Sequence, residues 1–217
     1  MRNTYDTANK NIMKVLLING SPKREGNTFI ALSEVAKTLE AEGIEAEIIH
    51  VGNKDIHGCI ACGKCKEQGK CVFDDLVNEV NKKFAEADGI VIGSPVYYAS
   101  PAGTMISFLD RLFYSATFDK SMKVGAAVAV ARRGGTTATF DVLNKYFTIS
   151  NMPVAPSQYW NNVHGRMPGE AAQDAEGLQI MRQLGRNMAF LIKSIQLGKE
   201  KYGLPEHEEW NPTHYIR

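Results

Sequence analysis

The sequence alternates short apolar runs with longer amphipathic segments, and this alternation limits the fold more than any other feature. The apolar runs predict strands at residues 15–18, 46–51, 89–93, 124–131 and 152–155. The amphipathic segments predict helices at residues 29–42, 74–86, 101–114, 136–149 and 175–195. Because alternating strands and helices give a parallel sheet covered on both faces, we expect a doubly wound α/β fold with strand order 2-1-3-4-5.

Chain length indicates one domain, since 217 residues are enough for a single sizeable core. We assign residues 14–197 to this domain and expect a loop at 58–72 within it. Residues 1–13 are expected to form an N-terminal extension and residues 198–217 a C-terminal tail.

The charge of the chain is nearly balanced, with 25 Lys and Arg against 24 Asp and Glu, for a formal net charge of +1. This balance gives no electrostatic reason to expect nucleic acid or a membrane surface as a partner. No apolar run has the length of a membrane span, and residues 1–12 lack the apolar core of a signal peptide. Cysteines without a secretion signal suit a reducing compartment, so we expect a cytoplasmic protein.

Residues 14–28 read as a strand, a polar loop and the start of a helix. Hydroxyls, backbone N–H groups and the positive end of a helix dipole can together bind a phosphate monoester. Arg24 would add positive charge to such a loop. The loop residues that would bind the phosphate are Ser21, Lys23, Gly26, Asn27 and Thr28.

The glycine spacing in this loop excludes two common nucleotide-binding motifs. Gly20 is followed by Gly26 and then Asn27, so the loop matches neither G-x-x-x-x-G-K-[ST] nor G-x-G-x-x-G. This points away from nucleoside triphosphates and dinucleotides and leaves a mononucleotide such as FMN. The alternative is an ordinary strand–helix turn with a good helix cap.

Two further loops should meet the phosphate loop, because they also follow strands of the parallel sheet. After the third strand, prolines frame a stiff loop that contains Ser94, Pro95, Val96, Tyr97 and Tyr98 and could contact an isoalloxazine ring. After the fourth strand, Arg133, Gly134 and Gly135 could bring positive charge and N–H donors to the pyrimidine end of a flavin. Alternatively, the tyrosines pack on neighbouring helices and the arginine is a solvated surface charge.

All four cysteines lie in one short segment with the spacing C-x2-C-x2-C-x5-C, as Cys59, Cys62, Cys65 and Cys71. Glycines between them allow the backbone to turn several thiolates toward one centre. Four thiolates in one loop suit a [4Fe–4S] cluster or a tetrahedral zinc ion, and successive x2 spacings favour the cluster. The alternative is a loop of free thiols.

The three loops together resemble those of the NADPH-dependent FMN reductases of the flavodoxin-like superfamily, over about residues 14–195. The cysteine loop is similar to that of the iron–sulfur flavoproteins, which carry FMN and a [4Fe–4S] cluster. The resemblance implies a phosphate site, a ring site and a site for the pyrimidine end of FMN. The phosphate site would comprise Ser21, Lys23, Asn27 and Thr28. The ring site would comprise Pro95, Val96, Tyr97 and Tyr98, and the pyrimidine end would lie beside Gly134 and Gly135.

We therefore expect an FMN-dependent oxidoreductase that takes electrons from NAD(P)H or a reduced carrier and passes them to a quinone-like or other acceptor. No side chain is expected to act as a catalytic acid or base, because the flavin carries the chemistry. Two alternatives remain open: a non-catalytic electron-transfer protein served by a ferredoxin-like donor, and a zinc-stabilised binding module without flavin. A flavin bound at the sheet edge would leave one ring face open, so we also expect a homodimer or homotetramer.

Overall fold

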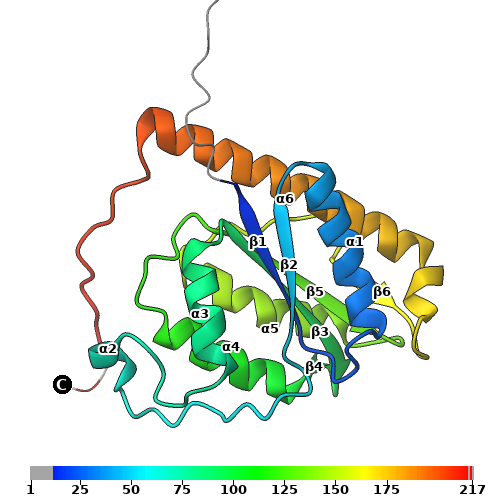
Figure 1. The fold of residues 1–217 in the computed structure, drawn as a ribbon, viewed down its shortest axis with the longest axis horizontal. Helices are drawn as coiled ribbons and strands as arrows, with labels where there is room; N and C mark the ends of the chain where they lie inside the picture. The colour runs from blue at the N-terminus through cyan, green and yellow to red at the C-terminus, as the bar shows by residue number, and fades with distance from the viewer. Residues whose placement is uncertain (1–11, 215, 217) are drawn as a thin grey trace, which may run out of the picture.

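The computed structural model describes residues 12–214 and residue 216. Strands and helices alternate along most of the chain and pack into three layers (Figure 1). The strands are β1 (Lys14–Asn19), β2 (Glu45–His50), β3 (Gly89–Tyr97), β4 (Ser100–Pro101), β5 (Val124–Ala131) and β6 (Asn162–His164). The helices are α1 (Asn27–Ala41), α2 (Cys65–Gln68), α3 (Leu76–Glu86), α4 (Gly103–Ser115), α5 (Thr136–Thr148), the 3₁₀ helix η1 (Glu170–Gln173) and α6 (Ala175–Tyr202).

The main sheet has the order β2-β1-β3-β5-β6, and every neighbouring pair in it is parallel. The order is the predicted 2-1-3-4-5, and the labels differ only because the short β4 pairs with β3 outside this series. The doubly wound α/β fold is therefore confirmed. The strands run down the view of Figure 1, so their carboxyl ends meet at the lower edge, where β4 lies and α1 begins.

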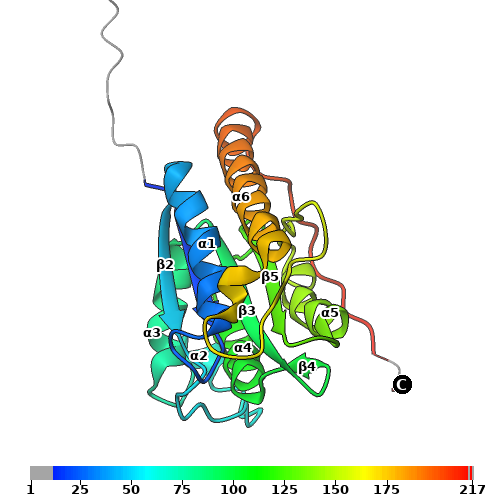
Figure 2. The same cartoon turned by 90° about the vertical axis from the view of Figure 1, so that its right-hand side faces the viewer.

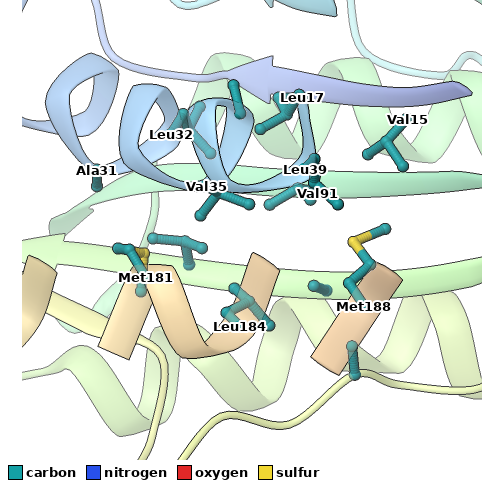
Figure 3. Close-up of a cluster of buried hydrophobic side chains, with 14 of the residues drawn as sticks. Val15, Leu17, Ala31, Leu32, Val35, Leu39, Val91, Met181, Leu184 and Met188 are labelled. Carbon is teal, nitrogen blue, oxygen red and sulfur yellow. The ribbon is translucent and has the colours of Figure 1, made fainter. Parts of the chain in front are cut away.

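Alternate residues of each central strand enter different cores, as a two-sided sheet requires. Leu17 and Val91 face α1 and α6 and pack with Leu32 and Leu184 (Figure 3). Figure 2 shows α1 and α6 side by side on this face. Ile18 belongs to the opposite core, which α3, α4 and α5 cover. With helices on both faces, only the sheet edges and the loops at the strand ends remain to build a site.

The predicted fifth strand at 152–155 is wrong in its position. Val154 makes only an isolated parallel bridge to Gly125, whereas the fifth strand of the sheet is β6, which pairs with the far end of β5. Proline has no N–H for a strand ladder; Pro153 lies within this segment and Pro156 directly follows it. The chain therefore leaves the sheet and returns at Asn162. The last helix also runs further than expected, to Tyr202 instead of 195.

None of the helices within the described residues is long and apolar enough to cross a membrane.

Candidate functional site

The phosphate loop links β1 to α1 and is held by its own polar groups. The side chain of Asn19 accepts a hydrogen bond from the Ser21 N–H at 3.0 Å and donates one to the Arg24 carbonyl at 3.0 Å. The Ser21 hydroxyl oxygen accepts from the Lys23 N–H at 3.2 Å. Asn19 is 1% exposed, so it acts as the internal brace of the loop.

A glycine from the neighbouring loop allows this close packing. A Cβ atom at Gly52 would lie 2.2 Å from both the carbonyl carbon and the carbonyl oxygen of Ser21. His50, at the end of β2, also bonds the Ser21 carbonyl through Nε2 at 2.7 Å. The end of β2 therefore packs against the phosphate loop and hydrogen-bonds to it. The sequence of the loop alone does not reveal this contact.

The start of α1 is open to a ligand. Among the described residues, no side chain caps this helix, and its first turn contains no Asp or Glu. The first N–H groups of a helix have no partner within the helix, and together with the helix dipole they attract anions. Thr28 lies in this turn and is 2% exposed. The geometry suits a phosphate group.

A cavity of about 280 Å³ extends from this helix start to the loop after β3. This volume is close to the lower end of the range for small-molecule pockets, roughly 300–1,000 Å³. Cations lining it are Lys23, Arg132 and Arg166, and none of its described lining residues is Asp or Glu. The full lining is Ser21, Lys23, Asn27, Thr28, Pro95, Val96, Tyr97, Val130, Ala131, Arg132, Gly165, Arg166 and Pro168.

Seven of the predicted cofactor-binding residues therefore line one cavity: Ser21, Lys23, Asn27, Thr28, Pro95, Val96 and Tyr97. The side chain of Asn27 is already hydrogen-bonded to another part of the chain. Its amide donates to the Met167 carbonyl at 3.0 Å and accepts from the Ala171 N–H at 3.1 Å. Asn27 thus ties the segment after β6 to the phosphate loop.

The other predicted residues lie around the cavity without lining it. Ser94 is buried, and its hydroxyl accepts from the Ala102 N–H at 2.9 Å, which fixes the loop after β3. Gly26 immediately precedes α1 and donates its N–H to the Lys23 carbonyl. Arg133 and Gly134 are exposed. Gly135 has a φ of +89°, and a Cβ there would lie 2.9 Å from Val96 Cγ1, so this glycine lets the two loops touch.

The two tyrosines differ in their surroundings. β3 continues past the sheet into a hairpin, in which Tyr97 pairs with Ser100. Tyr98 and Ala99 form its turn with φ angles of 51° and 56°, a conformation that non-glycine residues adopt at a cost. Tyr97 lines the cavity, whereas the Tyr98 side chain is fully exposed. The turn therefore presents one ring to the cavity and the other to the surroundings.

The sequence places residues 161–166 beside the pocket but assigns them no role, and in the structure Gly165, Arg166 and Pro168 line one wall of the cavity. These three residues follow β6, the strand that was predicted ten residues too early. A Cβ at Gly165 would lie 2.8 Å from Asn27 Nδ2, so the glycine is required for this contact. The available signal was a glycine and an arginine, Gly165 and Arg166, shortly after the apolar Val163.

The four cysteines line a second, small cavity with Phe73, Arg111 and Tyr114. Cys59 and Cys62 are exposed, Cys65 is buried in α2, and Cys71 is half-buried. Cys65 Sγ approaches the Tyr114 carbonyl at 4.0 Å, and Cys71 Sγ accepts a hydrogen bond from Arg111 Nε at 3.2 Å. The two sulfur atoms thus face different partners. In the part of the chain that the structure describes, no three His, Cys, Asp or Glu residues are arranged as a metal site.

Comparison with known proteins shows the family to which the chain belongs. A family model described as NADPH-dependent FMN reductase matches residues 13–166. An iron-sulfur flavoprotein of Methanocaldococcus jannaschii is 38% identical over 85% of this chain and 100% of its own length. One of Methanosarcina thermophila is 28% identical over 87% and 100%. An NADPH azoreductase of a Bacillus species is 25% identical over 87% and 100%.

Solved structures support the fold. The structure of RosB with a bound riboflavin-phosphate intermediate has a TM-score of 0.67 at 17% identity and covers 94% of each chain. An NAD(P)H:quinone oxidoreductase from Methanothermobacter marburgensis has a TM-score of 0.63 at 14% identity, covering 82% of this chain and 96% of its own. An archaeal flavodoxin has a TM-score of 0.56 at 18% identity, over 83% and 99%. The fold is flavodoxin-like, as the sequence predicts.

Proposed function

The chain belongs to the NADPH-dependent FMN reductase family, and we propose that it is an oxidoreductase that holds FMN in the cavity between α1 and the loop after β3. One observation carries this proposal: the cavity joins an uncapped helix start to an aromatic wall at Tyr97. The helix start, Ser21 and Thr28 would bind the phosphate group. The Pro95–Tyr97 segment would lie against the ring system.

FMN supplies hydride and electron transfer when it is bound, and the protein supplies position and charge. Lys23, Arg132 and Arg166 line the cavity and would lower the cost of holding a phosphate dianion there. Buried Ser21 and Thr28 would donate hydroxyl hydrogen bonds to phosphate oxygens. The exposed side of the cavity leaves a route for a nicotinamide or a small acceptor to approach. We propose NAD(P)H as donor and a quinone-like molecule as acceptor.

The cysteine loop would bind a [4Fe–4S] cluster as a second redox centre. Support comes from the four thiols that line one cavity and from relatives named as iron-sulfur flavoproteins. The loop also carries exposed Lys64, Lys66 and Lys70. This basic surface would suit an acidic protein carrier such as a ferredoxin. Cytoplasmic localisation fits such a centre and stays a prediction.

Reduction by nicotinamide distinguishes an enzyme from a non-catalytic carrier. We expect anaerobically purified protein to show flavin absorbance bands with a broad iron–sulfur shoulder, and we expect NADPH or NADH to bleach the flavin bands. The matched control is free FMN at the same concentration and nucleotide level, which should bleach far more slowly. A flavin that dithionite reduces but neither nucleotide does would favour the carrier, and a spectrum without flavin bands would favour the zinc-stabilised module.

Self-association is a further part of the proposal. Tyr97 and Tyr98 leave large aromatic surfaces exposed at the mouth of the cavity. A second subunit over this mouth would shield the flavin from water and bring another redox centre near. We expect a homodimer or homotetramer in sedimentation velocity at micromolar protein. A monomer with fully bound FMN under those conditions would contradict this.

A further inference from the structure

Arg111 is the most deeply buried charged residue of α4. It is 1% exposed and is buried in α4 together with Phe108 and Leu112. A charged side chain in such a place is costly unless paired groups satisfy it. The contacts of Arg111 therefore indicate which part of the chain this residue stabilises.

Asp75 pairs with Arg111 through both carboxylate oxygens. Arg111 Nη1 donates to Oδ2 at 2.6 Å, and Nη2 donates to Oδ1 at 2.9 Å. Asp75 also caps α3, because its side chain accepts from the Val77 N–H. An arginine side chain keeps its proton in proteins, and here it is paired with a carboxylate. The guanidinium is thus a fixed positive charge.

The remaining contacts of Arg111 go to the cysteine loop, and they reach both of its ends. Nη1 donates to the His57 carbonyl at 3.2 Å, just before the loop, and Nη2 approaches the Phe73 carbonyl at 3.5 Å, just after it. The guanidinium lies 4.7 Å from the centre of the Phe73 ring, which stacks on the His57 ring at 4.8 Å. Nε donates to Cys71 Sγ at 3.2 Å.

We propose that Arg111 is the positioning residue of the cysteine loop: it clamps the two loop ends, orients the Cys71 sulfur and places a positive charge beside it. The clamp is a property of the protein without metal. The electrostatic part rests on the proposed [4Fe–4S] cluster. Hydrogen bonds to the sulfurs and nearby charge set the reduction potentials of such clusters. Arg111 would therefore raise the potential of the cluster.

The clamp is tested in metal-free protein by hydrogen exchange with mass spectrometry. Arg111→Met should make amides of residues 57–73 exchange about tenfold faster or more, as expected for losing a hydrogen bond to a charged group. Arg111→Lys keeps the charge but loses the fork of donors, so it should show a similar effect. Arg182→Met is the matched control, because Arg182 pairs with Glu34 between α6 and α1 on the other face of the sheet. Unchanged exchange at 57–73 in both Arg111 variants would overturn the clamp.

If Arg111→Met fails to fold because Asp75 is left uncompensated, Arg111→Met/Asp75→Asn replaces it, since asparagine also caps helices. The electrostatic part is tested by redox titration after anaerobic reconstitution with iron and sulfide. The cluster potential should fall in Arg111→Met and stay closer to wild type in Arg111→Lys, while the flavin potential stays unchanged. The potential of the double variant is compared with that of Asp75→Asn alone, because the substitution at Asp75 removes a negative charge, and it should be the lower of the two. Equal cluster potentials would overturn this part. Wild-type protein that binds no iron would overturn both the cluster proposal and the effect of Arg111 on the cluster potential. The hydrogen-exchange data would still show whether Arg111 clamps the ends of the cysteine loop.

Discussion

Cys62→Ala is expected to abolish iron–sulfur loading while FMN remains bound. The chain has four cysteines, all in one loop, so no other thiolate can replace a lost ligand. Cys62 is exposed, unlike Cys65, so its removal should not disturb the core. Anaerobic reconstitution and metal analysis should give about four irons per chain in the wild type, as a [4Fe–4S] cluster requires, and far less in the variant.

Glu67→Gln provides a matched control in the same loop, because Glu67 is exposed on α2 and carries no thiol. It should retain the iron of the wild type. Air can oxidise thiols, so the preparation must stay anaerobic throughout. Stoichiometric zinc in the wild type, or no metal at all under these conditions, would contradict the cluster and reduce the chain to a flavin-only reductase.

Thr28→Val should weaken FMN binding by roughly tenfold to more than a hundredfold. The substitution keeps the shape of the side chain but removes a buried hydroxyl at the start of α1. A hydrogen bond to a charged group contributes about 1.5–3 kcal/mol, which corresponds to that range of affinity. Ser21→Ala should act in the same direction. Flavin fluorescence titration measures both.

Thr148→Val is the control for this series, because Thr148 is exposed at the far end of α5 and does not line the cavity. Its FMN affinity should equal that of the wild type. If neither Thr28→Val nor Ser21→Ala changes the affinity, the assignment of the phosphate loop is wrong.

The core of the fold could be predicted from sequence because its strands are buried on both faces. The run Val124–Ala131 is apolar throughout, and every residue of it is buried in β5. The position of the last strand could not be predicted in this way. β6 has only three residues, and it pairs with the carboxyl end of β5. The segment at 152–155 is more apolar, so the sequence pattern predicts the strand there instead. Short edge strands carry little periodicity of their own.

Residues that line the candidate cavity could be named from sequence where they are local to one loop, and could not be named where they come from elsewhere. Thr28 begins the helix that one loop joins to β1, and Tyr97 ends β3, so topology alone brings them to one edge of the sheet. Gly52 and Gly165 act by letting distant backbone approach, which no local pattern reveals. Arg111 left a weak signal, since a charged residue interrupts an otherwise buried face of α4. Its partners lie 36 to 54 residues away, and only the folded chain identifies them.

The central claim is that the start of α1 holds the phosphate of FMN. Calorimetric titration of flavin-free protein with FMN and with riboflavin tests it most directly, because the two ligands differ only in that phosphate. We predict one FMN per chain, bound at least about tenfold more tightly than riboflavin, with most of this preference lost in Thr28→Val. Equal affinities for the two ligands in the wild type, or no binding of FMN, would contradict the claim.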